Sequence, residues 1–399
     1  MKKAYVLLVT IFVSLTLFAC GPAEDPNTIT FWHTYGDNEE AVLKEVVIPM
    51  WNELNPDIPI KPVRQDSGQF NEMLTLSFGT GAGPDVARID IVQTAGFAEL
   101  GGLVKLDDMT GFNTFKNTFL DGPLSTNYYQ DGYYGVPLDT NAKAAVVNMT
   151  LLESELELTE LPATWEELEP LLDAREGYSI SVSGVGDWDS YPYFWLFGGE
   201  LTNSTFTQAS GYINSAESVA AINKIKDLRT KGILTIRDID GTADAWAGIN
   251  DQYIMFFEGP WAPFNDNIKP ALIPTYQGKS ATVVGGENIV ILETAKNKEN
   301  AYEFVKFMTS EDVQLAMLTS GQIPVLKSLV DHEDVLSDPK WSVYMEQLES
   351  AQARIPSPNH SDISEVWSDA MLAIFLDGAD VKTTLDAAAA ELDTLLSQE

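Results

Sequence analysis

Hydrophobic residues along the chain follow two spacings in turn, and this alternation predicts a mixed α/β fold. From Thr28 onward, short apolar runs of strand type are separated by segments with apolar positions at helical spacing. Strands are expected at residues 29–32, 58–63, 85–89 and 254–257, and helices at about 39–51, 70–78, 361–376 and 381–396. Such an alternation of strands and helices is typical of α/β proteins.

Two further helices carry start signals in the sequence. Thr164 precedes Glu167 by three residues, a spacing at which each side chain can hydrogen-bond the backbone N–H of the other residue. Asn214 and Glu217 have the same spacing ahead of another apolar-periodic segment. We therefore expect one helix to begin directly after Thr164 and another directly after Asn214.

Length and charge narrow the class of protein. A chain of 399 residues exceeds the size at which one hydrophobic core stops growing, so two domains are expected. The 24 Lys and Arg residues face 59 Asp and Glu residues, which gives a net charge of −35. A surface this acidic repels phosphates and the sequence has no basic run, so we expect no nucleic-acid partner.

The N-terminus has the composition of an export signal. Two lysines precede an apolar stretch, residues 4–19, which is short for a bilayer span. The stretch ends in LFAC, which resembles the lipobox of bacterial lipoproteins and puts the only cysteine, Cys20, at the cleavage point. We expect a signal peptide over residues 1–19 and a lipidated Cys20 with a polar tether over 20–27. A plain secretory signal or a buried cysteine are the alternatives.

Residue types that carry metal or covalent chemistry are sparse. The three histidines, His33, His332 and His360, lie far apart in the sequence, so we expect no metal site and no cofactor. Neither a nucleophile elbow nor a phosphate-binding glycine fingerprint is present in the sequence. Carboxylates are so abundant that a glycosidase pair could be assembled from almost any region. The sequence therefore favours a binding protein, with a secreted carbohydrate-active enzyme as the alternative.

Aromatic residues concentrate in a few short segments. WDSYPYFWLF, residues 188–197, holds six aromatic side chains in ten residues, and Trp261 lies among Gly and Pro residues in a loop after a predicted strand. Core packing explains any single ring. Rings in loops at strand ends, with carboxylates nearby, suit a sugar, because a sugar has an apolar C–H face and many hydroxyls.

Several segments together resemble the extracellular solute-binding proteins of ATP-driven sugar importers, specifically the maltose/maltodextrin-binding type. The resemblance extends over nearly the whole chain after the signal, in the order of the family. It is carried by ITFWHTYG, FGTGAGPDVARID, GYYGVPLDTNAKAAVVNMTLL, LPATWEEL, MFFEGPWAPFN, GGENIVI, KENAYEFVKFMTS, GQIPVLKS and ARIPSPNHSDISEVWSDAMLAI.

The resemblance implies a periplasmic-binding-protein-like fold of two α/β lobes, each built from discontinuous segments. Lobe one is expected at residues 28–137 plus 285–329, and lobe two at 142–284 plus 330–399. The lobes would be joined by a multi-strand hinge near residues 138–141, 283–286 and 328–335. The ligand would lie between them.

The resemblance also implies a set of ligand-binding residues: Trp32, His33, Asp90, Asp139, Asn141, Trp188, Tyr191, Tyr193, Trp261, Gly286, Glu287, Arg354 and Trp367. Trp261 and Trp367 match the family's stacking positions. Within the aromatic run, Trp188, Tyr191 and Tyr193 are expected to face the ligand, and residues 194–197 to pack in lobe two. Relatives present an Asp-Arg pair where this chain has Val92 and Gln93, so the exact sugar stays open.

The function implied is capture of a neutral oligosaccharide, with maltose or maltodextrin the first expectation and trehalose, sucrose or another oligosaccharide the alternatives. The partners implied are the membrane permease of an ABC transporter and, through Cys20, the lipid bilayer. The protein is expected to be a monomer on the extracellular face of the cytoplasmic membrane, or the periplasmic side where there is an outer membrane. We expect no catalysis.

Overall fold

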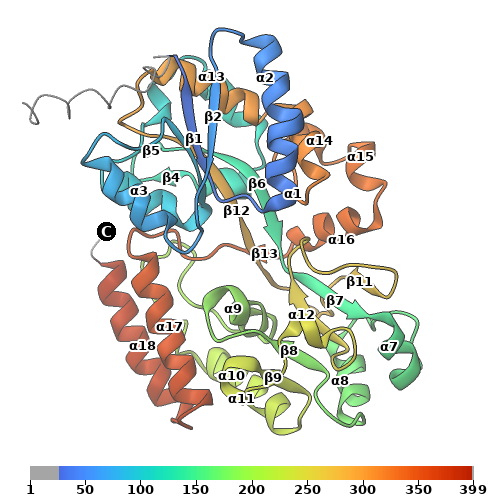
Figure 1. The fold of residues 1–399 in the computed structure, drawn as a ribbon. Coiled ribbons are helices and arrows are strands. Elements are labelled where there is room, and N and C mark those ends of the chain that lie inside the picture. The colour runs from blue at the N-terminus through green and yellow to red at the C-terminus, as the bar shows by residue number, and fades with distance from the viewer. Residues whose placement is uncertain (1–26, 398–399) are drawn as a thin grey trace, which may run out of the picture.

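Two separate β-sheets divide the molecule into two lobes (Figure 1). The structure, a computed structural model, describes residues 27–397. The sheet of lobe one has the order β13-β12-β3-β1-β2, and β6 also pairs with β12. Its strands are β1 (Ile29–His33), β2 (Ile60–Arg64), β3 (Val86–Asp90), β6 (Val136–Ala142), β12 (Thr282–Ile291) and β13 (Ala351–Gln352).

The sheet of lobe two has five strands in the order β11-β7-β10-β8-β9. They are β7 (Ala144–Asn148), β8 (Ile180–Val182), β9 (Leu234–Ile236), β10 (Met255–Glu258) and β11 (Ile268–Ala271). A short hairpin, β4 (Tyr128–Tyr129) and β5 (Gly132–Tyr133), stands apart from both sheets. Parallel and antiparallel pairs occur in each sheet, as expected for strands separated by helices.

Helices cover both sheets. Those of lobe one are α1 (Asp37–Val42), α2 (Ile48–Leu54), α3 (Phe70–Phe78), α4 (Thr94–Glu99), α5 (Phe112–Phe115), α6 (Asp121–Ser125), α13 (Lys298–Met308) and α14 (Glu311–Leu318). Those of lobe two are α7 (Met149–Leu156), α8 (Trp165–Asp173), α9 (Asp187–Leu196), α10 (Ala216–Thr230), α11 (Arg237–Asp240), α12 (Ala245–Gly248), α17 (His360–Phe375) and α18 (Val381–Leu396). α15 (Glu333–Leu336) and α16 (Pro339–Leu348) lie near the junction of the lobes (Figure 1). Shorter helical turns cover Leu43–Val47, Ile91–Gln93, Leu106–Asp108, Lys116–Thr118 and Lys327–Leu329.

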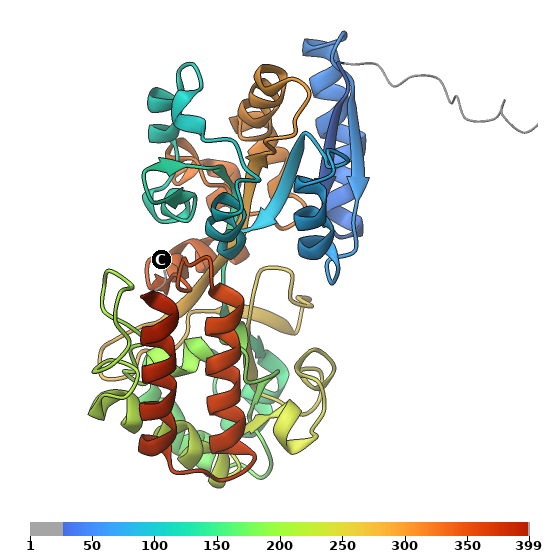
Figure 2. The same ribbon diagram turned by 90° about the vertical axis from the view of Figure 1, so that its left-hand side faces the viewer.

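The chain crosses between the lobes three times, and each crossing lies beside the ligand-binding region described below. β6 runs into β7 through Lys143, and β12 pairs with β13 at its first residues and with β3 at its last. The third crossing runs from α14 through α15, α16 and β13 to α17. Within α16, the Tyr344 hydroxyl donates to the Glu258 carbonyl of lobe two, and the Gln347 side chain accepts from the Ile273 N–H of the same lobe. α17 and α18 then form an antiparallel pair on one side of lobe two (Figure 2). Within residues 27–397, no helix has the length and apolar character that a bilayer span requires.

Most predicted elements are confirmed. α3 and α18 have the predicted bounds, and the Thr164 hydroxyl accepts a hydrogen bond of 3.3 Å from the backbone N–H of Glu167 at the start of α8. The prediction for Asn214 is wrong by one residue, because Ser215 caps α10 by accepting from the backbone N–H of Ser218. The Asn214 side chain instead accepts from the backbone N–H of Gly211 at 2.7 Å, which closes the preceding turn.

Candidate ligand-binding site

A cavity of about 460 Å³ lies between the two lobes and has a mainly polar lining. Lobe one contributes residues from the ends of β1 and β3, from α3 and from β12, and lobe two contributes residues from the N-termini of α9 and α17 and from the third crossing. The lining residues are Thr34, Ser67, Phe70, Asn71, Asp90, Val92, Gln93, Asp187, Glu287, Arg354, His360, Ser361 and Ser364. Of the residues predicted to bind ligand, Asp90, Glu287 and Arg354 line this cavity.

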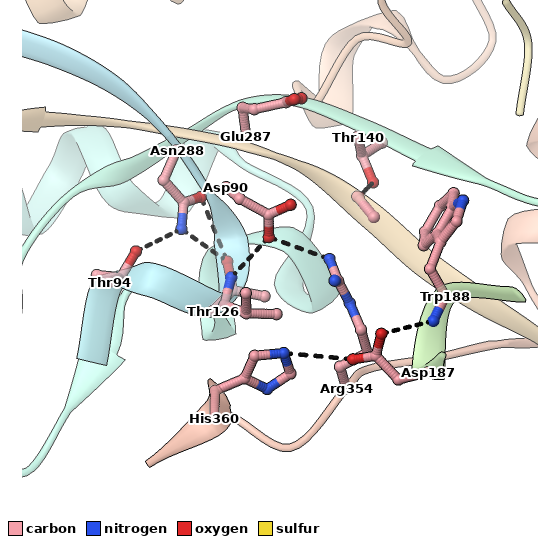
Figure 3. Close-up of polar contacts among 12 residues, drawn as sticks. Asp90, Thr94, Thr126, Thr140, Asp187, Trp188, Glu287, Asn288, Arg354 and His360 are labelled. Carbon is pink, nitrogen blue, oxygen red and sulfur yellow. Dashed lines mark hydrogen bonds and ion pairs between the residues drawn. The ribbon is translucent and has the colours of Figure 1, made fainter. Parts of the chain in front are cut away.

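Asp90 and Arg354 connect the two lobes across the cavity. Asp90 ends β3, where its Oδ1 accepts from the backbone N–H of Val92 at 3.0 Å and thereby starts the next helical turn. The same oxygen accepts a 3.0 Å hydrogen bond from the Arg354 guanidinium (Figure 3). The Asp90 side chain is 45% exposed and the Arg354 side chain 9%, so a ligand can approach the pair from the Asp90 side.

Arg88 organises a buried charge cluster on lobe one. Its guanidinium lies 2.8 Å from the Glu287 carboxylate and 3.6 Å from that of Asp139, and it donates to the Thr34 hydroxyl at 3.0 Å. Burial and the adjacent Glu287 charge raise the pKa of Asp139 well above its usual range. Burial alone would lower the pKa of Arg88, but the Glu287 and Asp139 carboxylates outweigh it and raise that pKa. Thr34 and Glu287 therefore reach the cavity with their positions fixed.

A histidine–carboxyl contact joins the N-termini of α9 and α17 in lobe two. The imidazole Nε2 of His360 lies 3.3 Å from Asp187 Oδ2, and Asp187 Oδ1 accepts from the backbone N–H of Trp188 at 2.6 Å (Figure 3). Burial works against the charged form of Asp187, yet the contact with His360 and the charge of Arg354 lower its pKa. Asp187 is therefore an ionised acceptor at the cavity wall.

Two indole rings, Trp188 and Trp261, form a stacked pair beside the cavity. Their ring centroids are 6.1 Å apart and their planes 23° apart. Trp188 is partly buried at the start of α9, whereas Trp261 is 45% exposed in the loop after β10. The Arg354 guanidinium lies 5.5 Å and the Lys143 ammonium 5.1 Å from the Trp188 ring centroid, within the range of cation–π attraction.

Charged residues near this tryptophan pair were missed by the sequence analysis. Lys143 is 2% exposed and its ammonium donates to Asp189 at 2.6 Å. Glu258 ends β10 with 6% exposure, and its carboxylate accepts from the backbone N–H of Gly259 at 2.8 Å. A lysine in the otherwise uncharged run TNAKAAVV is a usable signal, because a lysine that is fully buried requires a partner.

Three predicted ligand contacts lie in the core of lobe two, and their assignment is corrected here. Trp367 is 1% exposed, and its indole N–H donates to the Ser190 hydroxyl at 2.8 Å. Tyr191 packs against Trp367 at 4.9 Å, and Tyr193 stacks on Phe257 at 4.4 Å. Tyr191 and Tyr193 are buried because α9 is enclosed from Tyr191 to Leu196, and Trp367 is buried on the face of α17 that packs against α9. Trp188, near the start of α9, is only partly buried.

Two more assignments change because β1 alternates between its faces. His33 is fully buried between Phe31 and Tyr35, and burial lowers the pKa of His33 to about 4. Trp32 points to the opposite face and packs with the hydrophobic cluster of α3. Neither residue lines the cavity, and Thr34, the next residue, does so instead.

Three other predicted ligand contacts, Asp139, Asn141 and Gly286, lie in the strands next to the cavity and do not line it. Asp139 is 3% exposed and contacts Arg88 and Glu287 rather than the cavity itself. Asn141 is 7% exposed and lies opposite Gly285 in the register of β6 and β12. Gly286 has φ +130°, and a Cβ there would lie 2.5 Å from the Asp139 carbonyl oxygen. Gly286 is therefore required by the backbone rather than by a ligand.

Two α/β lobes joined by three crossings, with a cavity of polar and charged groups between them, define a two-lobe binding protein. The family model for bacterial extracellular solute-binding proteins matches residues 36–315, and the chain belongs to that family. Within the described residues, no group of three or more His, Cys, Asp or Glu side chains is placed to hold a metal ion.

Relatives of this chain cover almost its full length. It is 23% identical to the galactooligosaccharide-binding protein of Bacillus subtilis strain 168, over 97% of this chain and 96% of the relative. It is also 23% identical to the maltodextrin-binding protein MdxE of the same organism, over 97% and 95%. The GacH receptor of Streptomyces glaucescens, solved unliganded and with acarbose, has a TM-score of 0.81 at 21% identity over 93% of this chain and 98% of that one. This last similarity establishes the shared two-lobe fold.

Proposed function

We propose that the protein is the substrate-binding component of an ABC importer that captures a neutral oligosaccharide between its lobes and delivers it to a membrane permease. A ligand that contacts both lobes binds the closed arrangement better and shifts the population toward it. The closed form would then dock on the permease. The sugar itself would undergo no reaction.

The observation that carries this proposal is the exposed ring of Trp261, stacked on Trp188, together with the carboxyl groups of Asp90 and Asp187 that line the interlobe cavity. An exposed indole offers an apolar face to the C–H face of a sugar. Asp90 contacts the Arg354 guanidinium and Asp187 contacts the His360 imidazole, and both carboxyl groups keep oxygen capacity for hydrogen bonds from sugar hydroxyls. Because each carboxyl group already has a basic neighbour, the cavity suits a ligand without net charge.

Maltose or maltodextrin is our first candidate ligand, and trehalose, sucrose and other oligosaccharides are the alternatives. The names of the relatives support an oligosaccharide and differ in which one, since one is named for galactooligosaccharides and another for maltodextrin. Gln93 in the cavity lining, where the maltodextrin-binding type has an Asp-Arg pair, is a departure that changes the hydroxyl contacts.

The test is titration calorimetry of the purified protein with a panel of maltose, maltotriose, maltotetraose, trehalose, sucrose and galactooligosaccharides. We expect one of these to bind, and Trp261→Ala to weaken it at least tenfold, which is about 1.4 kcal/mol. The control is Trp246→Ala, another exposed tryptophan of lobe two, at 38% exposure and outside the cavity lining. No binding across the panel, or shortened products after incubation with maltodextrin, would reject the proposal.

The lobe ranges expected from the sequence, 28–137 plus 285–329 and 142–284 plus 330–399, are our proposal for the two moving bodies. The hinge would lie near residues 138–141, 283–286 and 328–335. Small-angle scattering with and without the bound sugar tests this. A radius of gyration that stays constant at saturation would contradict closure around the ligand.

Anchoring of the protein to the extracellular face of the membrane is a second part of the proposal. The signal peptide and Cys20 lie outside the described residues, so this part rests on the sequence alone. Lipidated Cys20 would hold the protein at the membrane beside its permease, because two or more acyl chains anchor a protein stably. We expect the anchored protein to be a monomer. Labelling with a fatty-acid analogue should mark the wild type and leave Cys20→Ala unmarked. Equal release of both into the medium would contradict the anchor.

A further inference from the structure

The space for the tryptophan pair, Trp188 and Trp261, is made by two glycines. A Cβ added to Gly259 would lie 2.5 Å from Cζ2 of Trp261, and a Cβ added to Gly285 would lie 2.8 Å from Cη2 of Trp188. Real Cβ atoms essentially never approach a heavy atom this closely. Each ring therefore covers a glycine on the strand or loop beneath it.

Neither glycine is required by its own backbone. Gly259 and Gly285 are absent from the glycines with positive φ, in contrast to their neighbour Gly286 at φ +130°. These positions therefore require glycine because there is no room for a side chain. At Gly259 the space is filled by the Trp261 indole, and at Gly285 it is filled by the Trp188 indole together with the Asn141 amide oxygen. Other glycines near the site do not have this property, since a Cβ on Gly186, directly before α9, would meet nothing within 4 Å.

The two rings differ in what surrounds them. Trp188 is contacted by Trp261, by the Arg354 guanidinium and by the Lys143 ammonium, and it rests on Gly285 of β12, a strand that joins the two lobes. Trp261 is 45% exposed and stacks only on Trp188 among the described rings. Trp261 therefore has the free face, and Trp188 is the fixed support behind it.

We propose that Gly259 and Gly285 are positioning residues of the sugar site, which hold Trp261 and Trp188 in the stacked arrangement that presents the Trp261 face to a ligand. The role of the two glycines in sugar binding rests on the proposed function. Their role in holding the two indole rings in a stack rests on the geometry alone. An alanine at Gly259 displaces the Trp261 ring toward solvent, because that side of the ring is open. An alanine at Gly285 meets Trp188 and the Asn141 amide oxygen, which are both held by neighbours.

The experiment uses Gly259→Ala in the full chain and reads out two properties. The first is the circular dichroism couplet of stacked indoles, measured without sugar. The second is the dissociation constant for the best sugar of the panel described above. We expect the couplet to be lost and the affinity to fall at least tenfold in Gly259→Ala. Gly186→Ala, the matched control, should keep the couplet and bind sugar within twofold of the wild type.

A rescue variant separates positioning from general damage. The colliding atoms belong to the distal ring of the indole, which phenylalanine lacks, so Gly259→Ala should change sugar affinity less than twofold when introduced into Trp261→Phe. A tenfold further loss in that background would overturn the inference, as would Gly259→Ala that keeps both the couplet and the affinity. A wild type that binds no sugar rejects the proposed function, while the couplet still decides the positioning role.

Discussion

Lobe one and lobe two meet the cavity with different chemistry. On lobe one, Arg88 and Asp139 are 4% and 3% exposed and hold each other and Glu287 through charge. On the lobe-two side, Asp187, Arg354 and His360 line the cavity. Trp261 lies outside this lining, is 45% exposed and stacks on Trp188 alone among the described rings.

Because of this difference, substitutions in the charge cluster and at Trp261 should change different properties: the stability of the fold in the first case and the affinity for sugar in the second. A buried charge that loses its partner destabilises the folded protein strongly, whether or not a ligand is present. An exposed ring contributes little to folding, and its apolar surface becomes buried only when a ligand covers it. We therefore expect variants of the charged cluster to unfold more easily and variants of Trp261 to bind more weakly.

The largest effect is expected for Arg88→Met, which keeps the length of the side chain and removes its charge. It leaves the Asp139 and Glu287 carboxyl groups adjacent, without the cation that pairs with Glu287 in this buried cluster. The free energy of unfolding should fall by about 3–5 kcal/mol, measured by urea denaturation at neutral pH. The control is Arg64→Met, whose ion pairs with Asp37 and Glu40 are at the surface, with an expected change of about 0–1 kcal/mol. Equal effects of the two variants would remove the contrast between the lobes.

The next effect distinguishes two tryptophans of the same lobe. Trp367→Ala removes a fully buried ring and its hydrogen bonds to Val185 and Ser190, so the free energy of unfolding should fall by about 3–5 kcal/mol. Trp261→Ala should change it by only about 0.5 kcal/mol and weaken sugar binding instead. Thermal and urea unfolding of both variants, each followed by sugar titration, decide this. A Trp367→Ala protein of wild-type stability that binds weakly would return Trp367 to the ligand contacts.

These contrasts mark which parts of the site the sequence could predict. The bounds of α3 and α18 follow from local apolar periodicity, and Thr164 caps α8 because the motif is contained in four residues. Asp90, Glu287 and Arg354, which the family resemblance predicts as ligand contacts, line the interlobe cavity.

Side-chain direction in α9 and β1 could not be predicted from the same patterns. The aromatic run of α9 is buried all round, so its periodicity does not mark one face, and Tyr191 and Tyr193 were assigned to the wrong side. In β1 the alternation of faces was available in principle, yet which face turns to the cavity depends on lobe-one packing far away in sequence. The same holds for Lys143, whose partner Asp189 lies 46 residues away.

A smaller effect, on the pH dependence of stability, is expected from His33, which is buried in lobe one. Its pKa of about 4 lies below the ordinary 6.5 because burial disfavours the imidazolium, with Arg88 adding to this and Glu40 opposing it. The folded protein thus binds fewer protons than the unfolded chain between these values. The stability that His33 contributes is complete above pH 6.5 and is lost as the pH falls toward 4, with a slope of at most about 1.4 kcal/mol per pH unit.

His33→Phe tests this because a phenyl ring fits between Phe31 and Tyr35 and does not titrate. The wild type should lose more urea stability than the variant between pH 6.5 and pH 4.5, while both behave alike between pH 7 and pH 8. Other groups titrate in this range in both proteins, so the difference between them reports His33. Parallel curves throughout would show that the histidine is not buried in its neutral form.

The smallest effect is expected where the two chemistries meet, at the ion pair between Asp90 of lobe one and Arg354 on the lobe-two side. Asp90 is nearly half exposed, so solvent screens the pair, and the coupling between Asp90→Asn and Arg354→Gln in a double-mutant cycle should be about 0.5–1 kcal/mol of unfolding free energy. Raising the ionic strength to 1 M should reduce it further. A coupling of several kcal/mol that is insensitive to salt would mean that Asp90 is as enclosed as Asp139. Asp90 would then belong with the residues that stabilise the fold, and the residues that mainly bind ligand would begin at Trp188.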